Sequence, residues 1–314
     1  MKTMKSHSVR IDQLRLRDLL MLDHLAQTGS LRVTAERLHV TQPAVTQALQ
    51  VLEQAFGVAL VQRGQRGQRG VSLTFAGQAA LVRLRVARQE VLAATAAALT
   101  PHATTLRVGA LPLALFHVLP QALARLRLAE PDVHVELTES TVAGLWRALA
   151  EGKVDAIVCR LPSPSEHEPL PVDVVYRTVS VGTEQLVLVA GRTHRLAAKR
   201  NPPLALLAQQ AWVLPPTGAF TRLAFDQVFI RAGLKPPGAA ISSLSFHSNL
   251  QLAATGDWLT VAPESAVRTY GPALKLKTIP AEWGEQSGGV ALAVRASSLA
   301  IPAVAALQNC FDCF

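Results

Sequence analysis

The chain has 314 residues, of which 49% are hydrophobic, so it can build more than one domain with a real core. Its net charge of +9 is uneven, because residues 1–103 carry 13 Lys and Arg against 6 Asp and Glu, whereas residues 104–314 carry 18 against 16. A positive N-terminal third favours nucleic acid over a membrane or an acidic protein as partner. With no apolar run of the roughly 18 residues that span a bilayer and no hydrophobic export signal in Met1–Arg10, the sequence predicts a cytoplasmic protein.

Two helices joined by a short turn are predicted near the N-terminus. The first carries leucines at every third position, namely Leu16, Leu19, Leu22 and Leu25. It stops near Thr28 and Gly29, after which Ser30 is a good N-cap for a short helix whose Ala35 and Leu38 point inward.

A third helix begins at Thr41, directly after the short connection through His39 and Val40. The Thr41 hydroxyl can cap it, and Pro43 is tolerated in its first turn. Its predicted buried stripe is Val45, Leu49, Leu52 and Phe56, and its outward face is Gln42, Thr46, Gln47 and Gln50. Amides and a hydroxyl can read base edges in the major groove. A solvated polar face is the alternative, but the tight turn before the helix favours a helix-turn-helix.

A two-stranded wing is predicted next, from the apolar runs Leu60–Val61 and Val71–Leu73. The connecting loop carries Arg63, Arg66 and Arg69 among glycines and glutamines, without an acidic residue. Such a loop can approach phosphates or a minor groove, whereas the alternative is a merely flexible basic loop.

The order and spacing of these motifs resemble the N-terminal signature of LysR-type transcriptional regulators. The matching fragments are Gly29-Ser30, Ala35-Glu36-Arg37-Leu38, Thr41 to Thr46, Leu52-Glu53 and Leu73-Thr74-Phe75-Ala76-Gly77. The chain departs from the family pattern at Thr34, where alanine is usual, at Leu60-Val61-Gln62-Arg63, and in a duplicated Gly-Gln-Arg triplet. Gln47 stands where many members have arginine, which puts one base contact in doubt. The predicted DNA-binding residues are Ser30, Thr41, Gln42, Pro43, Thr46, Gln47, Gln50, Arg63, Arg66 and Arg69.

A long helix is predicted over residues 74–99, roughly 39 Å in length at 1.5 Å per residue. A seam of mostly small residues runs along it, comprising Gly77, Ala80, Leu84, Ala87, Val91, Ala94 and Ala98. Packing against its own protein is one alternative; the family resemblance favours dimerisation through this helix. Pro101 ends it, and a linker follows.

Alternating strands and helices follow from residue 104, and the first run predicts a parallel sheet with helices over its faces. The first run comprises strand 106–110, helix 117–128, strand 133–137, helix 141–151 and strand 155–159. The second comprises strands 185–190 and 212–214, helix 221–231, a strand around Ile241, helix 246–255, and strands 259–261 and 274–279. Strand 289–294 and helix 301–311 return to the first sheet.

The predicted fold class is α/β with an N-terminal all-α winged helix-turn-helix. The resemblance implies that the α/β part is two Rossmann-like lobes of periplasmic-binding-protein type. We predict a DNA-binding domain at 1–73, a dimerisation helix and hinge at 74–103, lobe I at 104–183 and 281–314, and lobe II at 184–280.

A small-molecule effector is expected between the lobes, because ligands of such sheets lie beyond the C-terminal ends of strands. The predicted effector residues are Ala110, Leu111, Pro112, Ser140, Thr141, Arg160, Thr217, Gly218, Arg222, His247, Ser248 and Asn249. Arg160 and Arg222 suit a carboxylate or phosphate. The alternatives are helix caps for the hydroxyls, surface charges for the arginines, and capping or packing for His247. Segments 212–217 and 256–258 also resemble a subgroup with sugar or aromatic-acid effectors.

No catalytic motif, metal site or cofactor site is predicted. The sequence offers no Ser/His/Asp arrangement, HExxH or P-loop. Cys310 and Cys313 have no histidine nearby and are interpreted as a chance pair, and Cys159 as a small buried hydrophobe.

The predicted function is therefore that of a ligand-responsive, sequence-specific regulator and not an enzyme. Its expected partners are double-stranded DNA, a small-molecule effector and further copies of the chain, as a dimer through the long helix and then a tetramer. RNA polymerase is a further candidate partner. A solute-binding protein and an enzyme on the two-lobed scaffold are the alternatives; the helix-turn-helix argues against the first, and a turnover assay separates the second.

Overall fold

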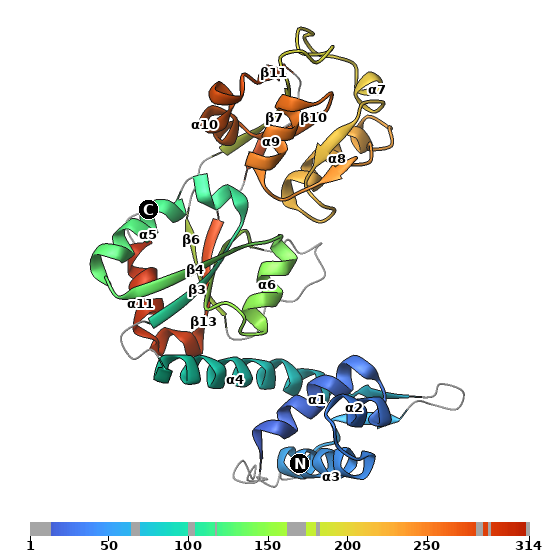
Figure 1. Cartoon of the computed structure of the whole chain (residues 1–314), viewed down its shortest axis with the longest axis vertical. Coiled ribbons are helices and arrows are strands. Elements are labelled where there is room, and N and C mark those ends of the chain that lie inside the picture. Colours follow the sequence, from blue (N-terminus) through green and yellow to red (C-terminus); the bar gives the residue numbers. More distant parts are fainter. Residues whose placement is uncertain are drawn as a thin grey trace, which may run out of the picture. The chain divides into compact units, whose positions relative to one another are not determined.

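The computed structural model describes residues 14–63, 70–99, 104–116, 118–161, 174–179, 183–280, 285–287 and 290–311. The chain divides into two compact units, one of residues 1–99 with 150–153 and one of residues 100–149 with 154–314 (Figure 1). None of the helices in these ranges is long and apolar enough to cross a membrane.

The first unit is a helix-turn-helix with a two-stranded wing. Its elements are α1 (Leu16–Thr28), α2 (Leu31–Arg37), α3 (Gln42–Phe56), β1 (Val61–Arg63), β2 (Val71–Leu73) and α4 (Phe75–Leu99). The predicted helices and the wing are confirmed, since β1 and β2 pair antiparallel with Val61 opposite Leu73. Gly29 ends α1 at φ 61, and Gly57 ends α3 at φ 70, a backbone region that favours glycine.

The core of the first unit joins α1, α2, α3, the wing and α4. Leu22, Leu25, Val45 and Leu52 are fully buried in it, as predicted. Leu16 is 47% exposed, so the predicted leucine stripe is wrong at its first position. Leu16 is the first residue of α1, and Leu14 packs against the core in its place, together with the predicted Leu19.

The start of α4 packs on its own unit, which corrects the predicted seam. A Cβ at Gly77 would overlap the Leu60 carbonyl, and Leu81, Ala80 and Leu84 join the core of this unit. Leu60, just before the first wing strand, lies against the first turn of α4. Gly77, Ala80 and Leu84 therefore pack within the same unit. Their seam partners further along α4 are exposed, namely Ala87, Val91, Ala94 and Ala98.

Lobe I has a five-stranded sheet in the order β4-β3-β5-β13-β6. The strands are β3 (Thr104–Ala110), β4 (Val133–Glu139), β5 (Ala156–Cys159), β6 (Val174–Val179) and β13 (Val290–Arg295). The predicted βαβαβ unit is confirmed, because β4, β3 and β5 are parallel. β13 returns antiparallel between β5 and β6, and β6 was not predicted.

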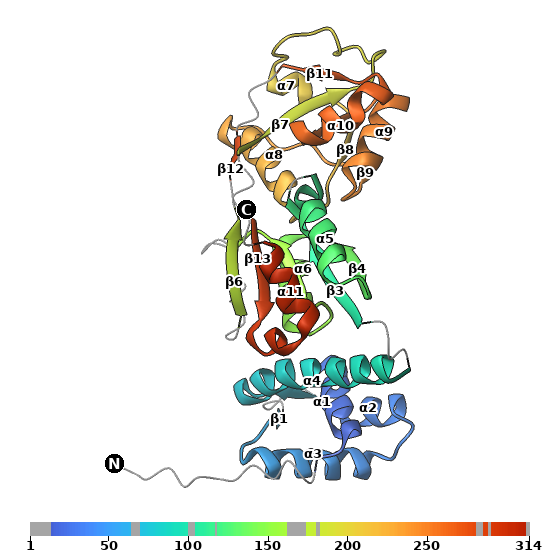
Figure 2. The same ribbon diagram turned by 90° about the vertical axis from the view of Figure 1, so that its left-hand side faces the viewer.

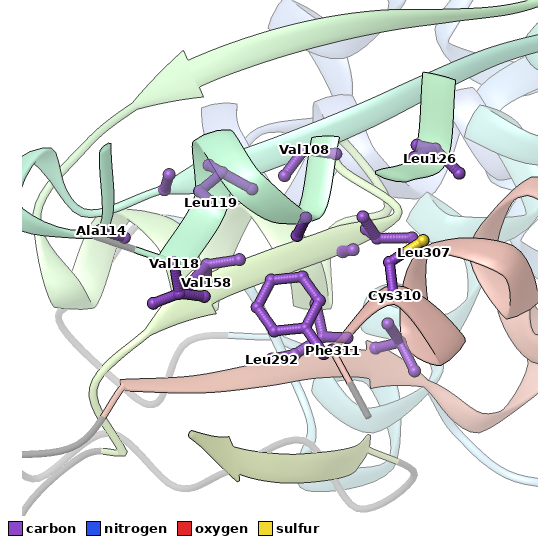
Figure 3. Close-up of a cluster of buried hydrophobic side chains, with 14 of the residues drawn as sticks. Val108, Ala114, Val118, Leu119, Leu126, Val158, Leu292, Leu307, Cys310 and Phe311 are labelled. Atoms are coloured by element: carbon purple, nitrogen blue, oxygen red, sulfur yellow. The ribbon is translucent and has the colours of Figure 1, made fainter. Parts of the chain in front are cut away.

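Helices cover both faces of the lobe I sheet. On one face, α5 (Val118–Ala129) and α11 (Pro302–Cys310) pack with Val108, Val158 and Leu292 (Figure 3). On the other, α6 (Val142–Ala150) covers Ile157 and Cys159. Cys159 is thus a buried apolar residue, as predicted. Cys310 is buried beside Phe311, and Cys313 lies outside the described residues.

Lobe II has a sheet in the order β11-β7-β10-β8-β9, with β12 (Glu285–Ser287) also paired to β7. The strands on this path are β7 (Thr183–Ala190), β8 (Trp212–Leu214), β9 (Ile241–Ser242), β10 (Leu259–Pro263) and β11 (Lys277–Ile279). β8 is parallel to β9 and β10, whereas β7 is antiparallel to β10. Four helices accompany the sheet, namely α7 (Leu204–Leu207), α8 (Phe220–Arg231), α9 (Phe246–Thr255) and α10 (Glu264–Leu274) (Figure 2).

The sequence missed α10 and therefore misplaced the strand after it. Leu274 ends α10, and β11 begins only at Lys277, so the predicted strand 274–279 is too long. Gly271 and Pro272 are typical of a loop, yet α10 contains both close to its end. The predicted helix 246–255 is confirmed without change as α9.

Candidate DNA-reading surface and interlobe cavity

Helix α3 presents an uncharged polar face to solvent. Gln42, Gln47 and Gln50 are exposed, Thr46 is half-buried, and Val45 on the opposite side is 1% exposed. The Thr46 hydroxyl donates to the Gln42 carbonyl at 3.2 Å, which leaves its acceptor lone pairs facing outward. Thr41 is the N-cap residue, but its hydroxyl makes no capping bond, so that part of the prediction is wrong. Pro43 is exposed in the first turn, as predicted.

The turn between α2 and α3 is fixed by hydroxyl groups. Ser30 Oγ accepts from the Val33 amide at 3.4 Å, so this residue serves as the predicted cap of α2. Thr34, the departure from the family pattern, is fully buried and lies 2.7 Å from the Thr28 hydroxyl, Oγ to Oγ. The pair, with the Thr34 hydroxyl donating to the Ser30 carbonyl at 2.8 Å, ties the start of α2 to the end of α1.

The surface of α3 is kept clear of negative charge. The carboxylate of this helix, Glu53, turns away and accepts from the Leu60 and Val61 amides at 2.8 and 3.1 Å. It therefore anchors the first wing strand instead of repelling phosphate. Of the predicted wing arginines, Arg63 closes β1. Arg66 and Arg69 lie outside the described residues.

A cavity of about 40 Å³ lies between the two lobes. It brings together four predicted effector residues of lobe I, namely Leu111, Pro112, Ser140 and Thr141. The sequence places Ala219 and Phe246 in segments expected to border the ligand, and the cavity contains both; it missed Leu113, Pro215, Phe220, Thr221 and Leu244. Most of these residues are apolar and lie next to predicted effector residues in the sequence. The one sequence signal that could have identified them is their position close to the end of a strand.

The remaining predicted effector residues lie elsewhere, because other contacts hold them. Ala110 is buried in the lobe I core, where its carbonyl accepts from the Ser140 amide at 3.3 Å. Thr217 and Gly218 are exposed, and Arg222 pairs with Asp226 at 2.8 Å.

The residues of the predicted α9 segment form contacts within lobe II. His247 is exposed against the Tyr270 ring, with the ring centroids 4.8 Å apart. Ser248 bonds to Ser245 at 3.1 Å, and the buried Asn249 donates to the Ser243 carbonyl at 3.1 Å. This segment therefore supplies Phe246, and not its polar residues, to the cavity.

Arg160 stands beside the cavity and contacts both lobes. The Trp146 indole donates to the Arg160 carbonyl at 3.1 Å, which fixes its backbone in lobe I. Its guanidinium carbon lies 4.7 Å from the centroid of the Phe220 ring in lobe II, a cation–π arrangement. Phe116 makes a second contact between the lobes, with its ring 6.2 Å from Phe246 and 5.9 Å from Tyr270.

The chemistry of the cavity suits a small ligand with an apolar body and one polar end. Ser140, Thr141 and Thr221 provide hydroxyl groups in an otherwise apolar lining. The Thr141 hydroxyl also caps α6 by accepting from the Gly144 amide at 3.2 Å. Beside them, desolvation raises the pKa of the Glu139 carboxyl above its ordinary value of 4.5. Within the described ranges, no cluster of three or more His, Cys, Asp or Glu side chains could hold a metal ion.

Two family models match most of the chain. The model of the LysR substrate binding domain matches residues 100–312, and that of the bacterial regulatory helix-turn-helix protein, lysR family, matches residues 16–78. The HTH-type transcriptional regulator GalR of Pseudomonas putida is 30% identical over 298 residues, 94% of this chain and 72% of that protein. The HTH-type transcriptional regulator PcaQ of Agrobacterium fabrum is 28% identical over 294 residues, 92% of this chain and 91% of that protein.

Solved structures share the fold. ArgP from Mycobacterium tuberculosis superposes with a TM-score of 0.57 at 18% identity, covering 95% of this chain and 96% of that one. Full-length CbnR, complexed with its target DNA, gives a TM-score of 0.52 at 22% identity, covering 95% and 99%.

Proposed function

Because this chain belongs to the LysR family of transcriptional regulators, we propose that it binds a specific operator through α3. We further propose that an effector in the interlobe cavity changes how the protein binds this DNA. The observation that carries the proposal is the exposed, uncharged polar face of α3 on a helix-turn-helix. Gln42, Pro43, Thr46 and Gln47 contact base edges, and Ser30, Thr41 and Gln50 lie at the border of the interface. Arg63, Arg66 and Arg69 contact the backbone or the minor groove.

We assign the DNA-binding domain to residues 1–73, the dimerisation helix and hinge to 74–103, lobe I to 104–183 with 281–314, and lobe II to 184–280. The regulator works in the cytoplasm, where its DNA is, without enzymatic activity. RNA polymerase is a candidate partner of the DNA-bound form.

We propose a dimer through α4 that assembles further into a tetramer. The exposed apolar side chains of α4 support the first contact, among them Phe75 at 89%, Val82 at 42% and Leu92 at 55%. A second set supports the other contact, since Leu128 on α5 is 83% exposed and Leu137 on β4 is 42% exposed. On α8 of lobe II, Ile230 is 52% exposed. Covering these surfaces with further copies removes apolar area from water.

The effector class that fits best is a small organic acid, with an aromatic acid or a sugar as further candidates. Ser140, Thr141 and the N-terminus of α6 suit an anionic end, and Arg160 adds a positive charge beside them. A cavity of about 40 Å³ has room for about one water molecule, so the lobes must separate for any effector to enter.

The experiment first selects an operator from random duplexes with the full-length protein. Binding of that operator and of scrambled DNA is then compared for wild type and for the double variant Gln42→Ala with Thr46→Ala. We expect operator affinity to fall at least tenfold with little change on scrambled DNA, because these side chains read bases.

The matched control is Gln251→Ala with Thr255→Ala on α9, where the threonine hydroxyl donates to the glutamine carbonyl at 3.1 Å just as Thr46 does to Gln42. This control should bind like wild type. An equal loss on operator and scrambled DNA in the α3 variant would refute base reading by these two residues.

A further inference from the structure

A second cavity of about 530 Å³ lies within lobe II, between α10, β11 and the turn after β7. Ala190 at the end of β7 pairs with Leu259 at the start of β10 and with Lys277. Pro215 of the interlobe cavity instead follows the end of β8, which runs parallel to β10. The two cavities therefore lie at opposite ends of the lobe II sheet, and we call the larger one the α10 cavity.

The lining of the α10 cavity is strongly cationic. Four of its ten residues are positively charged and one is negatively charged, namely Arg192, Arg268, Lys275 and Lys277 against Glu264. All five are exposed, and none of them forms an ion pair in the described part of the chain. Like charges gathered around one concave surface raise the local positive potential and attract anions.

Local structure explains only part of this cluster. Positive charge near the C-terminal end of α10 complements the helix dipole, which accounts for Lys275 and Lys277. It does not account for Arg192 after β7. Glu264 and Arg268 have the i,i+4 spacing that usually pairs on a helix, yet the guanidinium stays available to the cavity.

Lys275 adds a backbone observation. It ends α10 at φ 52, in the left-handed region where glycine or asparagine is usual. A lysine there costs backbone energy relative to glycine, and it directs a fourth cation to the same cavity.

We propose that the α10 cavity binds a small polyanion, an organic phosphate or a polycarboxylate. It is a depression that is largely open to solvent, and its volume of about 530 Å³ leaves room for a small organic anion. Guanidinium groups bind phosphate and carboxylate with paired hydrogen bonds, and lysines add point charges. Half-buried Val267 and Leu276 offer an apolar floor for a carbon skeleton. The site gives the regulator a second ligand input, separate from the interlobe cavity.

The test is calorimetric titration of the full-length protein at low ionic strength with inorganic pyrophosphate and, separately, with citrate. The variant is Arg268→Gln with Lys277→Gln, and the control is Arg231→Gln with Lys235→Gln, two exposed cations of lobe II outside the cavity. Both variants lose the same charge. We expect wild type and control to bind at least one probe equally, and the cavity variant to bind it at least tenfold more weakly.

Preference for pyrophosphate would assign a phosphorylated ligand, and preference for citrate a polycarboxylate. Equal binding by all three proteins would place the anion elsewhere, for example on the DNA-reading surface, and overturn the proposal. So would the absence of binding of either probe to wild type at millimolar concentration. Neither result bears on operator recognition, so the proposed function is tested separately.

Discussion

At the scale of single residues, hydrogen bonding and burial determine the protonation state of a side chain, which the sequence alone does not show. His194 is an example, because its side chain is 1% exposed and its two ring nitrogens have different partners. Nδ1 accepts from the Leu196 amide at 3.1 Å, and Nε2 lies 3.2 Å from Asp257 Oδ1. Desolvation lowers the pKa of His194 below its ordinary value of 6.5, opposed by Asp257 and assisted by Arg195. The neutral imidazole is therefore the form that the fold stabilises.

This shift predicts a loss of stability in acid. As pH falls below about 6.5, the unfolded chain takes up a proton on His194 before the folded chain does, so the free energy of unfolding decreases. Above that pH, His194 is neutral in both the folded and the unfolded chain and does not change the free energy of unfolding with pH. Urea unfolding at pH 7.5 and 5.5 should show a smaller decrease for His194→Gln than for wild type. The exposed His247→Gln is the control and should follow wild type; equal decreases in all three proteins would contradict the prediction.

Residue roles were predictable where one side chain acts through sequence-local geometry. Ser30 caps α2 as predicted, because a cap needs only an amide three residues away. Arg222 pairs with Asp226 one helical turn further on, and this pair competes with the predicted role of Arg222 in binding an effector. The i,i+4 spacing of the two residues is visible in the sequence. Phe220 was missed at the cavity, because apolar side chains on helices are usually core residues and only the meeting of two lobes places this one in a cavity lining.

At the scale of elements, periodicity predicted the helices and strands well but not what each face contacts. The small-residue seam of α4 is the clearest case. Spacing alone cannot distinguish a partner helix from a neighbouring strand, and the first part of that seam meets the wing through Leu60 and Leu81. α10 was missed for a different reason, because it contains Gly271 and Pro272, which are typical of a loop. β6 was missed because Val174, Val175 and Tyr176 do not alternate with polar residues.

The contact between α4 and the wing predicts that Gly77→Ala destabilises the DNA-binding unit. Alanine normally improves a helix by about 1 kcal/mol over glycine. Here its Cβ would overlap the Leu60 carbonyl, which is backbone and cannot rotate away, so we expect a net loss of about 1–3 kcal/mol. Thermal unfolding of the unit measures it.

The control is Ala79→Gly at an exposed position of the same helix, which loses only helix propensity, about 1 kcal/mol. An increase in unfolding temperature for Gly77→Ala would show that α4 does not pack tightly on the wing, and would return Gly77 to the seam predicted to face a partner helix.

At the scale of the whole molecule, regulation requires an arrangement of lobes that a ligand can change. The effector unit holds its lobes together at two places, Arg160 on Phe220 and Phe116 on Phe246 and Tyr270. The cavity beside these contacts is about 40 Å³, and under the proposed function an effector binds an arrangement in which at least one contact is broken. A ligand shifts such an equilibrium only by its preference for one arrangement. Under the proposed function, stronger contacts between the lobes therefore raise the effector concentration that is needed.

Weakening one contact should open the cavity without any effector. Phe220→Ala removes the ring that Arg160 covers, a cation–π contact of about 0.5–2 kcal/mol together with its apolar area. We expect amides around the α6 N-terminus, such as Gly144, to exchange hydrogen at least tenfold faster in the full-length variant. Leu223→Ala, at a residue of α8 that is 40% exposed and does not line the cavity, is the control and should exchange like wild type. If Phe220→Ala also exchanges like wild type, the Arg160 contact does not hold the lobes closed, and Phe116 with its partners must do so alone.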